Sequence, residues 1–163
     1  RHLERIPLGT SYVQQAHRIG TLMDTAPIRG SGTLVIDQTG VGRPVLDIFR
    51  DHGLRPVGVT ITGGAEEKRT SDGFGVPKLQ LVSRLQAMLH NGDLRIAGGL
   101  PEADALKGEL ADFRVSYTQG SGHARFGARE GRHDDLVLSV SLAVWYAARP
   151  QGSVGVGKVY GLM

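Results

Sequence analysis

The order of short apolar runs and longer amphipathic segments is the feature that most constrains the fold of this chain. Residues 32–36 form a short, continuous apolar run, which is typical of a buried strand in a parallel sheet. Residues 56–62 are rich in β-branched side chains and predict another strand. Two more short strands are predicted at residues 2–8 and 94–97. Strands that alternate with helices indicate an α/β fold with a mainly parallel central sheet.

Helical patterns fill the intervals between these strands. Ser11 is a suitable N-cap for a helix over residues 12–24, whose apolar side chains recur on one face. Further helices are predicted from Pro44 to about residue 52, from Pro77 until Gly92 ends it, and over residues 102–112 and 134–147. Residues 63–75 predict a loop or a loose hairpin, and residues 113–118 and 124–128 predict a hairpin.

Length and composition fit one domain. A chain of 163 residues can bury its own core, so we expect a domain over residues 1–149 and a glycine-rich tail over residues 150–163. The sequence has no cysteine, which excludes disulfides and thiolate metal sites. No apolar run approaches the roughly 18 residues that span a bilayer, so no membrane partner is expected. The net charge of +3 permits a nucleic-acid partner, although spare arginines on a solvated surface explain it equally well.

Asp37 is the first candidate functional residue, because it follows the apolar run at residues 32–36. Ligands of open α/β sheets gather at the carboxyl ends of the strands, where an Asp can hold a metal ion. The alternative is that Asp37 accepts a hydrogen bond from the backbone of its own turn. The segment with Gly40 and Gly42 lacks the lysine of a P-loop and the third glycine of a dinucleotide fingerprint, which disfavours nucleotide binding.

Asp134 and Asp135 are the second candidate, at the start of the last predicted helix. Helix N-termini favour carboxylates, so one Asp is explained as a cap or a first-turn residue, whereas two acids beside His133 are less well explained. Adjacent side chains on a helix diverge by about 100°, so one Asp can ligate a metal while the other caps the helix. His133 is a candidate ligand or proton carrier, or a polar loop residue. Carboxylates without cysteine suit hard cations such as Mg²⁺ or Mn²⁺, and such a site indicates phosphoryl-transfer chemistry.

Several motifs occur in an order that is fairly specific as a set. They are Asp37-Gln38-Thr39-Gly40-Val41-Gly42 after a buried strand, the strand end Thr60-Ile61-Thr62-Gly63-Gly64, Val76-Pro77-Lys78 at the start of a helix, and the run from Gly127 to Val137. Over roughly residues 5–145, this set resembles the nuclease domain of phage terminase large subunits. That domain is similar to ribonuclease H and the Holliday-junction resolvases. The resemblance implies a ribonuclease H-like fold, with a mixed, mainly parallel sheet flanked by helices.

The resemblance also implies a set of metal ligands. Asp37 matches the central-strand acid of the family, and Asp134 and Asp135 match the acids of its last helix. Two Mg²⁺ or Mn²⁺ ions would bind among them, one to activate water and one to stabilise the leaving 3′ oxygen. We therefore expect Asp37 to lie within reach of an ion shared with Asp134 or Asp135. The family's first hairpin and its first-strand Asp have no counterpart in this sequence, so we expect weak or no cleavage by this chain alone.

Basic residues are candidates for contacts with DNA phosphates, which contribute affinity without sequence information. One group precedes the acidic pair and the other flanks residues 63–75; they are Arg125, Arg129 and Arg132, and Lys68, Arg69 and Lys78. For each of these residues, an ordinary exposed charge is an equally good interpretation.

By resemblance, the chain is expected to be a metal-dependent endonuclease that cuts concatemeric double-stranded DNA during phage packaging. Its expected partners are an upstream ATPase domain, the portal and the small terminase subunit. Its expected location is the cytoplasm of the bacterial host and not the mature virion. Two alternatives are a non-catalytic prophage remnant that keeps the fold and binds DNA or the portal, and a resolvase-like nuclease that acts on branched DNA.

Overall fold

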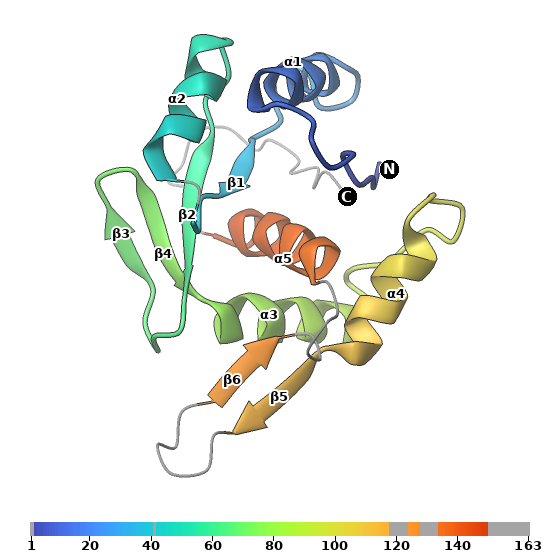
Figure 1. Ribbon diagram of the computed structural model, residues 1–163. Coiled ribbons are helices and arrows are strands. Elements are labelled where there is room, and N and C mark those ends of the chain that lie inside the picture. The colour runs from blue at the N-terminus through green and yellow to red at the C-terminus, as the bar shows by residue number, and fades with distance from the viewer. Residues whose placement is uncertain (1, 41, 118–123, 128–133, 150–163) are drawn as a thin grey trace.

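Five helices and six strands make up the parts of the chain that the computed structural model describes, which are residues 2–40, 42–117, 124–127 and 134–149 (Figure 1). In chain order the elements are α1 (Tyr12–Met23), β1 (Val35–Asp37), α2 (Gly42–Asp51), β2 (Val57–Thr62), β3 (Lys68–Thr70), β4 (Gly73–Pro77), α3 (Lys78–His90), α4 (Ala103–Asp112), β5 (Arg114–Tyr117), β6 (Ala124–Gly127) and α5 (Asp135–Ala147). The predicted helices are all present, with ends that differ by a few residues at most. Ser11 caps α1 as predicted, because its side chain accepts the Gln14 N–H while the Gln14 side chain accepts the Ser11 N–H.

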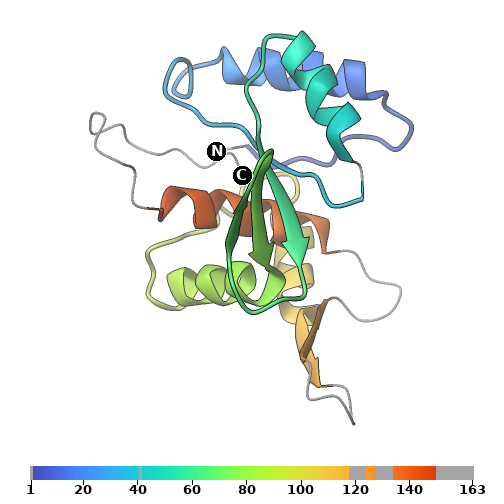
Figure 2. The same cartoon turned by 90° about the vertical axis from the view of Figure 1, so that its left-hand side faces the viewer.

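A four-stranded sheet in the order β1-β2-β4-β3 forms the centre of the fold. Strands β1, β2 and β4 are parallel, and β3 is antiparallel to β4. In this register Asp37 of β1 is level with Val59 of β2, which is level with Phe74 of β4. The prediction of an α/β fold with a mixed, mainly parallel sheet is therefore confirmed. Strands β5 and β6 pair with each other as the predicted hairpin, which projects away from this sheet (Figures 1 and 2).

Helices pack on both faces of β1. Successive side chains of a strand point to opposite faces, and here Val35 packs with the core that α5 and α3 form over β2 and β4, centred on the fully buried Trp145. Ile36 packs on the other side, with residues of α1 and α2 such as Phe49. A third core joins α3, α4 and another face of α5, and it includes Val137 and Val144. Helix α5 therefore links the sheet to the helical layer, and its two ends have different surroundings.

Two predicted strands do not form. Residues 2–8 pair with no strand, and Leu3 is instead buried among side chains of α3, α4 and α5. Residues 94–97 are also outside any strand, and Leu94 and Ile96 pack against the same helical core. The third parallel strand is instead β4, which lies in the segment predicted as a loop or loose hairpin. Of those two interpretations the hairpin is the right one, because β3 and β4 pair antiparallel.

A close approach between β2 and β4 explains why the third parallel strand begins with a glycine. Gly73 has a φ of +149°, and a Cβ atom on it would lie 1.9 Å from the carbonyl oxygen of Gly58. No other residue fits this position without moving one of the strands. Gly73, one of the glycines that predict a loop in the sequence, is here a requirement of strand packing. Within the described residues, no helix combines the length and the apolar character needed to cross a bilayer.

Candidate functional site

Asp37 ends β1 at the carboxyl edge of the sheet, and its side chain is exposed. Its Oδ1 accepts the backbone N–H of Thr39 at 2.8 Å, so the interpretation as a turn-forming residue is confirmed for this oxygen. The turn is itself tied to β2, because Thr39 Oγ1 accepts the N–H of Ile61 at 2.8 Å and Gln38 Nε2 donates to Thr60 Oγ1 at 3.1 Å. These bonds fix where the Asp37 carboxylate stands at the sheet edge.

Asp134 occupies the N-cap position of α5 but does not cap it through its side chain. Its Oδ2 instead accepts a hydrogen bond from Lys78 Nζ at 2.6 Å, in a pair whose side chains are each less than a quarter exposed. The ammonium of Lys78 also lies 5.6 Å from the centre of the Phe113 ring, where the negative face of the ring attracts it. The interpretation of this Asp as a helix cap is therefore wrong, and its partner is the cation that begins α3.

Arg5 binds the second acid of the pair. Its Nη1 lies 3.2 Å from Asp135 Oδ2, its Nη2 contacts Glu109 Oε1, and its Nε lies 3.7 Å from Glu102 Oε2. One guanidinium thus connects the segment before α1 with both α4 and α5. Asp135 lies in the first turn of α5, where the exposed N–H groups of a helix favour a carboxylate.

Glu109 of α4 supplies the cap that Asp134 does not. Its Oε2 accepts the backbone N–H groups of Leu136 and Val137, each at 3.0 Å, and its side chain is only 8% exposed. A carboxylate at this position satisfies two of the N–H groups that a helix N-terminus leaves without an intrahelical partner. The sequence analysis missed Glu109. The signal was available, because Glu109 follows Leu106 by three residues and falls on the buried face of α4, where an acid requires a partner.

The other end of α5 is held against the β3–β4 hairpin. Trp145 Nε1 donates to Glu67 Oε2 at 2.9 Å, and Arg149 pairs with Glu67 Oε1. The guanidinium of Arg149 lies 4.1 Å from the centre of the Phe74 ring and 4.7 Å from that of Trp145. Burial raises the pKa of Glu67, but hydrogen bonds from Arg149 and Trp145 outweigh it and hold that pKa below its ordinary value. Contacts at both ends therefore fix the position of α5, and with it the acidic pair.

The parallel order of the strands relates Asp37 to the acidic pair. Asp37 ends β1, and Lys78, which binds Asp134, directly follows β4. The carboxyl ends of parallel strands lie at one edge of a sheet, and the intervening β2 separates β1 from β4 by roughly 10 Å. Asp37 is level with Phe74, so it is set back from Lys78 along the strand direction. Four residues separate Phe74 from Lys78, which is roughly 13 Å along the strand in addition to the separation across β2. A metal ion shared by Asp37 and the acidic pair stays a prediction.

The donor atoms suit a hard divalent cation, since all are carboxylate oxygens and none is sulfur. The arrangement of these donor atoms is not that of a complete metal site. In the described part of the chain, no three or more His, Cys, Asp or Glu side chains are grouped in a way that could hold a metal ion. The acids instead have Lys78, Arg5 and the Thr39 N–H as partners. The edge thus offers the ligand chemistry of a metal site, with the charges of its acidic pair balanced by cations of the chain.

The remaining predicted residues lie at several places. Lys68 and Arg69 are exposed on β3, and the guanidinium of Arg69 lies 5.6 Å from the centre of the Phe74 ring. Arg125 lies in β6, opposite Ser116 of β5. His133, Arg129 and Arg132 fall outside the described residues.

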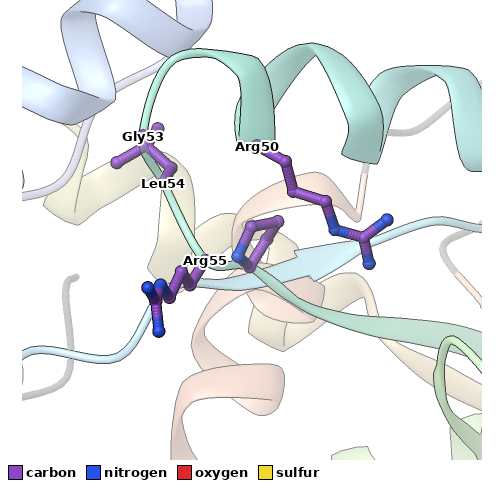
Figure 3. A pocket seen from close by; sticks show the side chains of 5 residues that line it. Arg50, Gly53, Leu54 and Arg55 are labelled. Carbon is purple, nitrogen blue, oxygen red and sulfur yellow. The ribbon is translucent and has the colours of Figure 1, made fainter.

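A separate open pocket of about 410 Å³ lies at the turn between α2 and β2 (Figure 3). Its lining residues are Arg50, Gly53, Leu54, Arg55 and Pro56. This turn precedes β2, so the pocket lies toward the amino ends of the strands, away from Asp37. Arg50 is paired with Asp47 at 2.9 Å, and none of the predicted site residues lines the pocket.

No protein-family model matches this chain, and comparisons with curated proteins and with solved structures give no match. The class that the fold defines is an α/β protein with an open, mostly parallel sheet. The residues at the carboxyl edge of this sheet carry the functional proposal.

Proposed function

We propose that the chain is a divalent-metal-dependent DNA endonuclease domain with a ribonuclease H-like fold, from the DNA-packaging terminase of a phage. The observation that supports this proposal is the parallel order β1-β2-β4, in which Asp37 ends β1 and Lys78, the partner of Asp134, directly follows the end of β4. Open α/β sheets bind ligands outside the carboxyl ends of their strands. A phosphodiester at this edge would meet both acids and bases of the chain.

Asp37, Asp134 and Asp135 would hold the ions, Mg²⁺ or Mn²⁺. When bound, such ions supply an activated water and stabilise the charge on the leaving oxygen. The chain's own residues position these ligands. Glu109 fixes the start of α5 through two backbone N–H groups, and the bond to Thr39 fixes the carboxylate of Asp37. No side-chain nucleophile is required for this class of reaction.

Basic residues around the edge would contact the sugar–phosphate backbone of double-stranded DNA. Lys68 and Arg69 on β3 and Arg125 on β6 are candidates within the described elements. The resemblance extends the proposal to an upstream ATPase domain, the portal and the small terminase subunit as partners, and to the cytoplasm of the bacterial host as the location.

A second candidate function is a non-catalytic module of the same fold that binds DNA or the portal. Two observations favour it. Both acids at the start of α5 are paired with cations of the chain, and the described residues include no group of three or more potential ligands. A pair of acids that serves only to anchor Lys78 and Arg5 would have these same contacts.

The experiment is a Mn²⁺ and Mg²⁺ titration of DNA cleavage with linear, supercoiled and four-way-junction substrates. It compares the 163-residue chain with a version extended upstream to include another strand, each with Asp37→Asn, Asp134→Asn and Asp135→Asn. We expect metal-dependent cleavage in the extended version, abolished by Asp37→Asn and by one variant of the acidic pair. Asp104→Asn is the matched control, because Asp104 is an almost fully exposed acid of α4 whose partner is Lys107.

The outcomes separate the candidates. Preference for the four-way junction would indicate a resolvase-like nuclease. DNA binding without cleavage under every metal condition, and without any effect of Asp37→Asn, would support the non-catalytic module instead.

A further inference from the structure

Three arginine side chains lie close together where the C-terminal end of α5 meets the β3–β4 hairpin. The guanidinium carbons of Arg69 and Arg149 lie 5.6 Å and 4.1 Å from the centre of the same Phe74 ring. Arg149 also lies 4.7 Å from the centre of the Trp145 ring, and Arg84 of α3 donates to the Trp145 carbonyl oxygen at 3.4 Å. Arg69, Arg84 and Arg149 therefore form one basic surface, which we call the arginine surface.

The charges of the arginine surface are not balanced. Glu67 is the carboxylate that these arginines meet in the described part of the chain, because it pairs with Arg149 and the charge of Arg84 also stabilises its ionised form. Its chain neighbours Glu66 and Lys68 are both exposed, and their charges offset each other. Three guanidinium groups around one carboxylate leave a surplus of two positive charges.

Holding α5 in place accounts for two of the three arginines. Arg149 pairs with Glu67 and lies against two aromatic rings, and Arg84 binds a carbonyl oxygen in the last turn of α5. Arg69 differs, because it is exposed on β3 and forms no hydrogen bond or ion pair within the described residues. A cation–π contact is weak at an exposed site, so Arg69 can turn from the Phe74 ring toward an anion.

We propose that the arginine surface binds a phosphate group, either as the free ion or in the backbone of a nucleic acid. Guanidinium groups bind phosphate oxygens through pairs of parallel N–H bonds. A free phosphate ion carries a charge of about −1.5 at neutral pH, and two successive backbone phosphates carry about −2, so both sources match the surplus. Neither the acids of the candidate site nor a metal ion takes part, so this site is independent of the proposed function.

Trp145 provides the signal for the test, because it is the single tryptophan of the chain and its indole N–H donates to Glu67, the partner of Arg149. Inorganic phosphate, and separately a short DNA duplex, is titrated into the full chain at constant ionic strength while the indole N–H resonance is followed by NMR. Arg69→Gln removes the charge, and Arg69→Lys keeps the charge without the guanidinium fork.

Arg55→Gln is the matched control. Arg55 is also exposed and also lacks a hydrogen bond or ion pair within the described residues, but it lies at the turn before β2. The two glutamine variants therefore have the same net charge. Far-UV circular dichroism and the urea midpoint verify that every variant is folded.

We expect a saturable shift of the Trp145 indole resonance, with an affinity about fivefold weaker in Arg69→Gln and unchanged in Arg55→Gln. Arg69→Lys should bind with an affinity between those of the wild type and Arg69→Gln. A response to inorganic phosphate identifies the free ion as a ligand, whereas a response to the duplex alone assigns the surface to a nucleic-acid backbone. The proposal is overturned if neither ligand shifts the resonance, if Arg69→Gln binds as tightly as the wild type, or if Arg55→Gln weakens binding equally.

Discussion

Replacing Glu109 by alanine should loosen the start of α5, on which the candidate acids stand. The Glu109 carboxylate accepts the N–H groups of Leu136 and Val137 and pairs with Arg5, from a site that is only 8% exposed. Asp134, the residue at the N-cap position, makes no capping hydrogen bond that could compensate. The variant therefore removes the side-chain cap of α5 and one partner of Arg5.

The magnitude follows from these two losses. Loss of a helix cap costs about 1–2 kcal/mol. Breaking a fully buried ion pair costs about 3–5 kcal/mol, but Arg5 is 35% exposed and keeps Asp135 and Glu102, so about 1 kcal/mol is the more suitable figure here. The sum is a loss of about 2–3 kcal/mol in the free energy of unfolding. For a chain of this length, that corresponds to a fall in Tm of roughly 5–10 °C.

The assay is urea unfolding at pH 7, followed by circular dichroism. Glu102→Gln is the control, because Glu102 Oε2 also lies 3.7 Å from Arg5 Nε but does not cap α5. We expect this variant to lose less than about 0.5 kcal/mol in the free energy of unfolding. Glu109→Gln keeps an oxygen acceptor but loses the charge, so it should fall between the two. The reasoning is refuted if Glu109→Ala lies within about 0.5 kcal/mol of the wild type, or if Glu102→Gln is equally destabilising.

Three further predictions concern the parts of the fold that hold the site. Gly73→Ala places a Cβ 1.9 Å from the carbonyl oxygen of Gly58, so it should cost about 3 kcal/mol or more in urea unfolding or prevent folding. Trp145→Ala empties the centre of the core over the sheet and should cost about 3–5 kcal/mol in the same assay. The pKa of Glu67 is lower in the folded state than in the unfolded chain. Its contribution to stability is therefore present above the pKa of the unfolded chain and is lost as the pH falls through the folded value. Urea midpoints between pH 7 and pH 3 should fall less steeply for Glu67→Gln than for the wild type.

Local signals were enough to predict the helices and two of the three parallel strands. Ser11 correctly predicted the N-terminus of α1. The apolar run before Asp37 predicted β1, and the β-branched residues at 56–62 predicted β2. These patterns reflect interactions between residues that are near in sequence, or the burial of a whole segment. They therefore appear in the sequence without knowledge of which element packs on which.

The misses came from contacts between distant segments. Apolar residues at 2–8 and 94–97 suggested strands, but Leu3 and Ile96 are buried by packing on helices, and burial alone does not provide a strand partner. The glycines around residue 73 predicted a loop. Gly73 is in fact required by the close approach of Gly58 in β2, which the sequence does not reveal. Glu109 was missed for the same reason. Its carboxylate caps α5 by accepting two backbone N–H groups, the first of which is 27 residues later in the sequence.

In the candidate site, too, the positions of the acids were predictable from local signals, whereas their partners were not. The sequence placed Asp37 at a strand end and Asp134 and Asp135 at a helix start, and the structure has them there. The partners of the acidic pair were not predictable, because Lys78 and Arg5 reach it from other elements. Lys78 was a candidate for DNA contacts only, and its pairing with Asp134 gives it a different place in the site.

The most direct test of the central claim is to map Mn²⁺ onto the chain by paramagnetic broadening of backbone amide signals in NMR spectra. If Asp37 and the acidic pair form one metal site, amides next to Asp37 and at the start of α5 should broaden first and together at low Mn²⁺. Amides at the turn around Arg55, toward the opposite edge of the sheet, should broaden last, and Asp134→Asn should weaken the effect at both places. Broadening around one of the two acidic positions without the other, or centred on an exposed acid such as Asp104, would contradict a shared metal site.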